Sequence, residues 1–388
     1  MGTTERLSRA NNIADLRVLA RRRLPRPIFD YIDGGADDEL SLARNAGAFA
    51  DYEIVPDVLT DVSQIATETR VFEEPVSWPL MLAPTGLTRM FHGEAELAVA
   101  RAAAKHGLLY SLSTLGTTRL EDLAEAFGGP KVFQIYIFKD RGLTREFVAR
   151  CRDAGFHGLA LTVDTPVAGN RERDRVNGLS LPPKLTWRSL LSFALHPAWS
   201  LPALRGDRFD FANVSHRVDA LAGGPMSLFD YIGGQFDRSL TWRDVEWLAA
   251  EWNGSLAIKG LMTPEDAKRA IASGASGVMV SNHGGRQLDG APAPIDQIAA
   301  VRDALGDGPD VICDGGIRRG SDVVKALALG ATACSIGRPY LYGLAAGGET
   351  GVDRVLALLH EEFERTLALA GVNAIARLER RHVRRVRR

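Results

Sequence analysis

The chain has 388 residues and a formal net charge of −1, from 47 Lys and Arg against 48 Asp and Glu. Hydrophobic residues make up 45% and charged residues 24%, an ordinary globular mixture that excludes disorder as the global state. The balanced charge argues against a nucleic-acid-binding protein, and no apolar run approaches the roughly 18 residues needed to span a bilayer.

The cysteines and the amino terminus favour a reducing compartment. Cys151, Cys313 and Cys334 form no CxxC pair, so we expect three buried free thiols rather than a disulfide framework. The first residues contain no apolar signal core, and Arg6 does not fit the myristoylation pattern. The sequence therefore predicts a cytoplasmic protein.

Residues 1–75 are expected to be mostly helical and to cap the domain that follows. Beyond them the sequence alternates short apolar runs, which suit strands buried on both faces, with longer amphipathic stretches. Helices are predicted over Glu94–His106, Pro264–Ser273 and Ser321–Leu329, each followed by glycine. The eight apolar runs are Leu80–Ala83, Leu108–Leu112, Val132–Ile135, Leu159–Val163, Leu256–Ile258, Val278–Val280, Val311–Cys313 and Ala333–Ile336.

Eight such runs with helices between them predict an α/β fold with a parallel sheet, either a closed (β/α)8 TIM barrel or a doubly wound open sheet. Every run is followed by a residue capable of chemistry, and a barrel brings all eight strand ends to one face. We therefore favour a barrel over about 76–371, within a single domain spanning 1–388. The residues at the strand ends are Thr85, Ser113, Gln134, Tyr136, Asp164, Lys259, Ser281, His283, Asp314, Gly337 and Arg338.

The connection between the fourth and fifth predicted strands is far longer than an ordinary loop, with an insertion at about 174–235. Within it, residues 181–204 combine Trp187, Phe193 and Trp199 with Lys184 and Arg188. This mixture suits an interfacial helix lying on a membrane. The alternative is an apolar segment packed on its own barrel or on a second subunit.

Two glycine-rich segments follow the seventh and eighth predicted strands, and both carry arginine: 314–320 (DGGIRRG) and 336–339 (IGRP). Glycine lets backbone N–H groups approach a phosphate, and arginine neutralises it. These two loops form the usual phosphate site of a barrel. The alternative is a pair of tight turns with solvated arginines.

The sixth predicted strand leads into 281–290 (SNHGGRQLDG). A histidine beside an arginine at a strand end offers a base next to a clamp for a carboxylate. Asp164 would orient His283, and Lys259 would supply a fixed positive charge. The spacing of His, Cys and carboxylates matches no zinc pattern, so no metal site is predicted.

The segment 281–290 resembles the signature of the FMN-dependent 2-hydroxy-acid oxidase and dehydrogenase family, whose members include glycolate oxidase, L-lactate dehydrogenase and mandelate dehydrogenase. The resemblance covers about 24–371. Further matching segments are LPRPIFDYIDGGADDE (24–39), APTG (83–86), LST (112–114), FQIY (133–136), LTVDTP (161–166), IKG (258–260), DGGIRRGSDVVKALALGA (314–331) and IGRPYLYGLA (336–345).

The resemblance implies a role for each matching residue. His283 would be the base and Asp164 its partner, with Tyr136 near the oxidised hydroxyl group. Tyr31, Arg171 and Arg286 would bind the substrate carboxylate, and Lys259 would stabilise the reduced flavin. The remaining FMN contacts would come from Pro84, Thr85, Gly86, Ser113, Gln134, Thr162, Ser281, Asp314, Gly316, Arg318, Gly337 and Arg338.

By this resemblance the chain would oxidise a lactate- or mandelate-like L-2-hydroxy acid to the 2-keto acid and pass electrons through FMN to a quinone or another acceptor. The alternative within the family is an oxidase that uses oxygen and produces hydrogen peroxide. Leu115 stands where glycolate oxidases have Trp, which predicts a roomier substrate pocket, and Gly86 stands where oxidases often have Ala. Family resemblance also predicts a homo-oligomer, as a tetramer. The segments 196–199 (HPAW), 229–237 (FDYIGGQFD) and 239–248 (SLTWRDVEWL) look most like membrane-associated bacterial L-lactate dehydrogenases, whereas 169–174 (GNRERD) and 348–353 (GETGVD) look more like mandelate dehydrogenase. The first resemblance predicts peripheral contact at the cytoplasmic face of the inner membrane.

Two other classes of protein would share parts of this pattern. A barrel isomerase that uses reduced flavin on a phosphorylated substrate would share the phosphate loops but has no need of His283 with Arg286 and Tyr31. A non-catalytic flavoprotein or membrane scaffold is disfavoured by the presence of His283, Asp164 and Arg286. The carboxyl terminus departs from the family pattern, with six arginines in residues 380–388. We expect a solvated, disordered tail there rather than a lipid-binding one.

Overall fold

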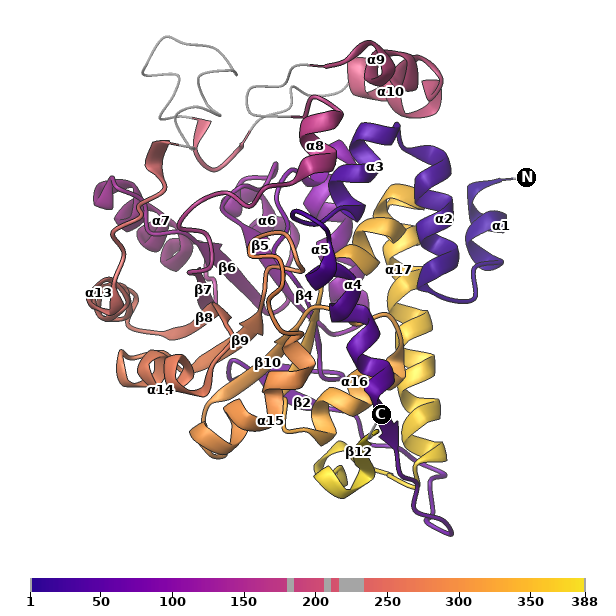
Figure 1. Cartoon of the computed structure of the whole chain (residues 1–388), viewed down its shortest axis with the longest axis vertical. Helices are drawn as coiled ribbons and strands as arrows, with labels where there is room; N and C mark the ends of the chain where they lie inside the picture. The colour runs from indigo at the N-terminus through magenta and orange to yellow at the C-terminus, as the bar shows by residue number, and fades with distance from the viewer. Residues whose placement is uncertain (1, 180–184, 206–210, 216–233, 387–388) are drawn as a thin grey trace.

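The computed structural model describes residues 2–179, 185–205, 211–215 and 234–386. Within them, eight parallel strands close into a barrel in the order β10-β11-β4-β5-β6-β7-β8-β9 (Figure 1). Each predicted run overlaps one of these strands, so the barrel is confirmed over the open sheet. The strands are β4 (Leu80–Leu82), β5 (Leu109–Ser113), β6 (Lys131–Ile135), β7 (Gly158–Thr162), β8 (Ser255–Leu261), β9 (Gly277–Ser281), β10 (Asp310–Asp314) and β11 (Ala333–Ile336).

Helices connect the strands and surround the barrel, and the three predicted helices are confirmed within one residue at each end (Figure 1). At α14 the side chain of Thr263 accepts a hydrogen bond from the backbone of Asp266, and Pro264 occupies the first turn. The helices are α5 (Ala95–Lys105), α6 (Leu120–Ala126), α7 (Arg141–Asp153), α13 (Trp242–Trp252), α14 (Pro264–Ala272), α15 (Pro294–Leu305), α16 (Gly320–Ala328) and α17 (Arg338–Leu369), with short 3-10 turns η2 (Thr88–Met90), η3 (Ile375–Arg377) and η4 (Arg380–His382).

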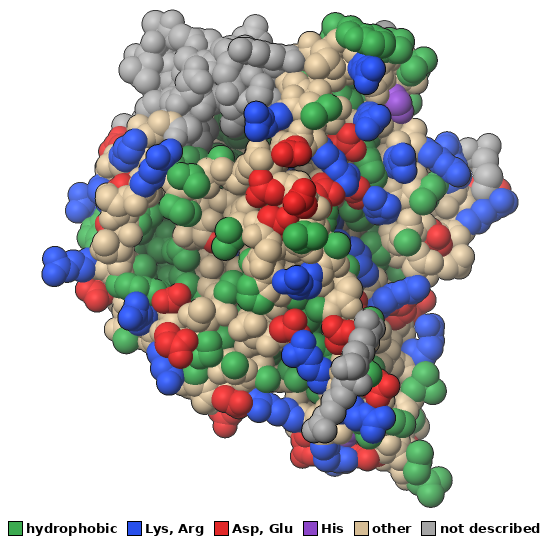
Figure 2. Space-filling view, in the orientation of Figure 1, with side chains coloured by type: hydrophobic (Ala, Val, Ile, Leu, Met, Phe, Trp, Pro, Cys, Tyr) green, Lys and Arg blue, Asp and Glu red, His purple; other side chains and the backbone are tan. Residues whose placement is uncertain are grey.

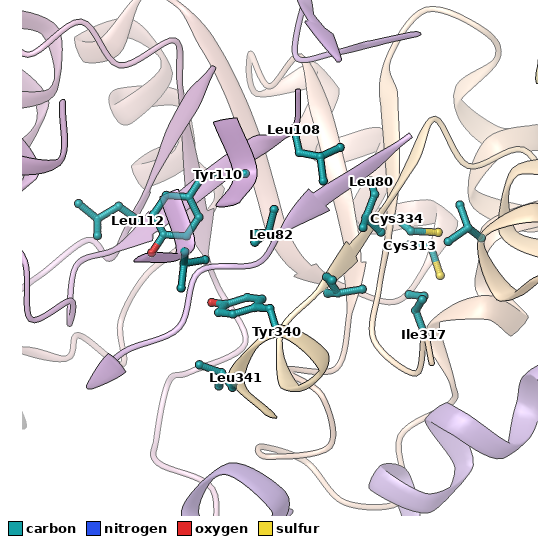
Figure 3. Close-up of a cluster of buried hydrophobic side chains, with 14 of the residues drawn as sticks. Leu80, Leu82, Leu108, Tyr110, Leu112, Cys313, Ile317, Cys334, Tyr340 and Leu341 are labelled. Carbon is teal, nitrogen blue, oxygen red and sulfur yellow. The ribbon is translucent and has the colours of Figure 1, made fainter. Parts of the chain in front are cut away.

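Alternate residues of each strand supply two separate apolar clusters. Met81 and its counterparts on the other strands point into the barrel, whereas Leu80 and Leu82 pack outward with Tyr110 and Leu112 (Figure 3). Cys313 and Cys334 lie side by side on β10 and β11 in the outer cluster (Figure 3). All three cysteines are buried and free, as predicted.

The amino-terminal region is helical only as far as residue 51. It contains α1 (Thr3–Ser8), α2 (Ile13–Arg23), α3 (Arg26–Asp33), α4 (Leu40–Gly47) and the 3-10 turn η1 (Ala48–Asp51), and α2 packs along α17 (Figure 1). The prediction that residues 1–75 are mostly helical is wrong for the part after residue 51, because β1 (Tyr52–Ile54), β2 (Thr69–Val71) and β3 (Glu74–Val76) follow. Val71, Phe72 and Val76 join the inner barrel cluster, so the β2–β3 hairpin closes the amino-terminal mouth.

The insertion after β7 holds α8 (Glu172–Val176), α9 (Trp187–Ala194) and α10 (Pro197–Arg205). The predicted interfacial segment 181–204 begins outside the described residues; its described part forms two short helices, not one. Both helices project from the carboxyl-terminal end of the barrel (Figure 1), and Trp199 Nε1 donates to the Met90 carbonyl at 2.8 Å. Among the described residues, no helix has the length and apolar character to cross a membrane.

The part of the carboxyl terminus that the structure describes, through residue 386, is folded against the rest of the chain, which contradicts the expected disordered tail. The strand β12 (Val383–Arg385) pairs antiparallel with β1. Its arginines and those just before it form ion pairs with carboxylates from distant parts of the chain, although their side chains remain exposed. The pairs are Arg380–Asp303, Arg381–Asp57, Arg384–Glu53 and Arg385–Asp296.

Candidate active site

A cavity of about 650 Å³ opens at the carboxyl ends of the barrel strands. Of the predicted site residues, only Asp164 and Ser281 do not line it, and each lies one contact behind a residue that does. The predicted residues that line the cavity are Tyr31, Pro84, Thr85, Gly86, Ser113, Gln134, Tyr136, Thr162, Arg171, Lys259, His283, Arg286, Asp314, Gly316, Arg318, Gly337 and Arg338. The sequence prediction of one composite site is therefore matched by their positions.

His283 and Asp164 form a pair at the ends of β9 and β7. His283 Nδ1 lies 2.9 Å from Asp164 Oδ1, which holds the proton on Nδ1 and leaves Nε2 as the proton-accepting nitrogen of the neutral ring. Burial disfavours the carboxylate, but the charge and hydrogen bond of His283, with Lys259 beyond, lower the pKa of Asp164. Asp164 thus stays ionised and stabilises a protonated imidazole.

Close packing fixes this pair. His283 has a left-handed backbone (φ 57°), a conformation that costs a non-glycine residue energy and persists only when the surroundings impose it. Its backbone N–H donates to Ser281 Oγ at 3.1 Å. Gly260 leaves room for Asp164, since a Cβ at that position would lie 2.7 Å from the Asp164 Cβ and Cγ atoms.

Two arginines enclose the ring of Tyr31. The Arg286 Cζ atom lies 4.8 Å from the ring centroid and the Arg171 Cζ atom 5.2 Å. Arg286 also donates to the Tyr31 carbonyl at 2.6 Å, so α3 holds the guanidinium in place. Burial and the neighbouring Arg171 lower the pKa of Arg286. A pair of half-buried cations that repel each other is a site suited to an anion.

Tyr136 lines the same cavity from the segment after β6, and it is almost fully buried. Burial and the nearby Asp164 raise its pKa, so the phenol stays protonated and remains a donor. The ring of Phe236, which returns from the insertion, meets the Tyr136 ring edge to face at 5.0 Å. Phe236 also forms an isolated antiparallel bridge with Phe138, which attaches the end of the insertion to the β6 segment.

Lys259 provides a buried positive charge at the end of β8. Its Nζ atom lies 3.0 Å from both Ser281 Oγ and Asp314 Oδ2, and Ser281 donates to Asp314 at 2.7 Å. Burial disfavours the ammonium group, but Asp314 and Asp164 raise the pKa of Lys259. The amine is therefore protonated, and its charge is available to the cavity floor.

The residues of the cavity fit FMN. Gln134 Nε2, Thr162 Oγ1 and Ser335 Oγ are buried with no hydrogen-bond partner among the described residues, which leaves polar groups for a flat heterocycle. At the other end of the cavity, Gly316 has φ 87° in the glycine-rich segment after β10, and Arg318 lines the cavity beside it.

Arg338 is a second basic residue at this end of the cavity. Burial and Arg286 lower the pKa of Arg338 to about 9, and a nearby phosphate would offset this destabilisation of the charged form. Arg338 donates to the carbonyls of Ile32, Gly34 and Gly284, so it also ties α3 to the His283 segment.

Sequence reasoning missed three residues that shape the site. Gln287 joins the β7 and β9 segments, because its Nε2 donates to the Asp164 carbonyl at 2.9 Å and its Oε1 accepts from the Gly169 N–H at 3.0 Å. Phe236 covers Tyr136, and Asp174 lies behind Arg171 at 3.3 Å. Gln287 falls within the signature segment and Asp174 lies three residues after Arg171, so proximity to a predicted site residue was the available signal.

Comparison with known proteins agrees with this geometry. The profile of a family described as FMN-dependent dehydrogenase matches residues 20–385. An L-lactate dehydrogenase of Pectobacterium atrosepticum is 42% identical over 366 residues, covering 93% of this chain and 94% of that protein. Glycolate oxidase 1 of Zea mays is 40% identical over 372 residues, covering 96% and 95%. The crystal structure of the monotopic membrane protein (S)-mandelate dehydrogenase superimposes with a TM-score of 0.93 at 40% identity, covering 97% of this chain and 100% of that one.

Proposed function

Because the chain belongs to the FMN-dependent dehydrogenase family, and is thus an FMN-dependent enzyme, we propose that it oxidises an L-2-hydroxy acid to the corresponding 2-keto acid. One observation carries this proposal: His283, held by Asp164 behind it, and a pair of half-buried arginines face the same cavity. The arginines bind the substrate carboxylate, and the base reaches the carbon or hydroxyl group next to it.

Each side chain has a distinct role in the proposed reaction. Arg171 and Arg286 hold the carboxylate, and Tyr136 donates a hydrogen bond toward the substrate hydroxyl group. His283 Nε2 takes a proton, and the carboxylate of Asp164 stabilises the imidazolium that results. When bound, FMN accepts the two electrons that leave the substrate carbon. Lys259 places a positive charge at the cavity floor, where negative charge would develop.

The walls of the cavity suggest the class of substrate side chain. Leu115, Leu179, Phe211 and Phe236 line it, together with Met90, so part of the cavity wall is apolar. We propose a lactate- or mandelate-like acid, with room for a side chain larger than a methyl group. This assignment is supported by relatives and structures named L-lactate dehydrogenase and mandelate dehydrogenase.

We propose that the electrons then pass to a quinone or another acceptor, which makes the enzyme a dehydrogenase. Relatives named glycolate oxidase favour the alternative, reoxidation by oxygen with formation of hydrogen peroxide. Anaerobic bleaching of the visible flavin band with L- and D-lactate, mandelate, glycolate and longer 2-hydroxy acids tests both points. Bleaching by an L-acid followed by slow reoxidation in air is the expected result. Fast reoxidation would identify an oxidase, and no bleaching by any acid with flavin bound would refute the proposed reaction.

We also propose that α9 and α10 contact a membrane peripherally, at the cytoplasmic face of the inner membrane. Trp187, Leu190, Leu191 and Leu201 are exposed on these helices and Leu195 between them, and Figure 2 shows hydrophobic side chains gathered at this tip. The structural relative titled a monotopic membrane protein supports the assignment.

Vesicle flotation of the full chain, with and without the double substitution Leu190→Ser and Leu191→Ser, tests membrane contact. Loss of flotation in the double variant is expected. The homo-oligomer, proposed as a tetramer, is tested by light scattering of the same two proteins. A change of assembly without any flotation of the unsubstituted protein would mean that these helices pack on a second copy instead.

A further inference from the structure

Asp174 is a buried acid that the proposed reaction does not use. It lies on α8 with a side chain only 8% exposed, and it does not line the cavity. Its Oδ2 atom is 3.3 Å from Arg171 Nη1 but has no hydrogen-bond partner among the described residues. Burial of a carboxylate that is held mainly by charge costs desolvation free energy, so the position of Asp174 calls for an explanation.

The charged groups around Asp174 offer an explanation for its position. It faces the charges of both Arg171 and Arg286 from behind the cavity wall, with Asp30 as the neighbouring acid. Burial raises the pKa of Asp174, while the two arginines act against that rise and favour the carboxylate. Asp174 therefore offsets part of the positive charge that Arg171 and Arg286 present to an anion in the cavity.

We propose that Asp174 is a specificity-determining residue, which makes the site accept monocarboxylic 2-hydroxy acids and reject dicarboxylic ones. The inference rests on the proposed function, since it assumes that the arginines bind the substrate carboxylate. A second carboxylate in the cavity would be repelled by Asp174, because the two arginines that face Asp174 are already paired with the first carboxylate. Other cations on the cavity wall, such as Lys139 and Arg238, are unchanged in any variant of Asp174. Such built-in repulsion is a common source of specificity.

The test uses two anions of nearly the same shape that differ by one charge, oxamate (one negative charge) and oxalate (two). Their dissociation constants are measured with the FMN-loaded protein by perturbation of the flavin absorbance, without turnover. The variant Asp174→Asn keeps the shape and removes the charge. A unit charge at roughly 10 Å, with an effective dielectric constant of about 20, alters the affinity for one further anionic charge by about tenfold. The ratio of oxalate to oxamate affinity should therefore rise by about tenfold in the variant.

The matched control is Glu172→Gln, which removes an exposed charge from the same helix and should leave the ratio within about twofold of its original value. Asp174→Ser is a second neutral variant, for the case that the protein does not accommodate the asparagine amide. It should show the same rise in the ratio of oxalate to oxamate affinity. Equal weakening of both anions, with an unchanged ratio, would mean that Asp174 only holds Arg171 in place and would overturn the inference. The same change in the control variant would also overturn it. If the unsubstituted protein binds neither anion, the arginine clamp and the proposed function fail, and this inference fails with them.

Discussion

The substitution Asp164→Asn tests the central chemical assignment, the stabilisation of a protonated His283. The two side chains meet at 2.9 Å, and the Asp164 side chain is 13% exposed. Asparagine keeps the oxygen that accepts from Nδ1, so the ring keeps its orientation and tautomer. The second oxygen, Oδ2, has no hydrogen-bond partner among the described residues, so its replacement by NH2 breaks no bond. The variant therefore removes charge with little change of shape.

The size of the effect follows from the nature of the bond. A hydrogen bond to a charged group contributes about 1.5–3 kcal/mol, which corresponds to roughly 10- to 150-fold in a rate when it is made in the transition state. The depressed pKa of Asp164 shows that the carboxylate is preferred in this environment, so the charge is present at neutral pH. The rate of flavin reduction should fall by that factor, with a smaller change in substrate affinity, because the arginines still bind the carboxylate.

The assay is anaerobic stopped-flow reduction of the flavin by the acid that bleaches it fastest. Asp303→Asn is the matched control, because Asp303 is an exposed acid paired with Arg380 far from the cavity. The control should reduce its flavin at the original rate. A rate for Asp164→Asn within about threefold of the unsubstituted protein, with FMN bound, would refute the assignment of His283 as the base supported by Asp164.

Three further predictions follow from the contacts of the site. Lys259→Met leaves Asp314 buried without its cation and should destabilise the fold by about 3–5 kcal/mol, measured by chemical unfolding; an unchanged stability would contradict the pairing. Phe236→Ala removes the ring that covers Tyr136 and should lower kcat/KM by about tenfold, whereas Phe236→Leu should retain most of it. Asp33 is buried, but hydrogen bonds from Arg17 and Tyr342 and the charges of Arg17 and Arg173 lower its pKa. The ionised Asp33 therefore stabilises the fold above the pKa of about 3.9 that it has in the unfolded chain, and this contribution is lost as the pH falls through its pKa in the folded protein. Unfolding titrations below pH 5 should therefore show a steeper loss of stability for the natural chain than for Asp33→Asn.

The strands and their chemical ends could be predicted because both depend on local pattern. A run such as Val278–Val280 is short and β-branched, and the residue after it must lie at the carboxyl end of a parallel strand. The arginine-rich terminus was predicted wrongly for the opposite reason. Its charges are visible in the sequence, but the carboxylates that hold them, such as Glu53 and Asp57, lie more than 300 residues away. A run of like charge defines a tail only where such partners are absent.

The same limit explains why the supporting residues of the site escaped prediction while the reactive ones did not. His283 and Arg286 stand in a conspicuous segment, whereas Asp174 and Phe236 acquire their roles only from the way the insertion leaves and rejoins the barrel. The departing end carries Arg171 and Asp174 on or beside α8, and the returning end places Phe236 on the ring of Tyr136. Both anchors of the long insertion are therefore parts of the active site. An insertion of this length can project toward a membrane without loosening the chemistry, because its two ends are fixed where the substrate binds.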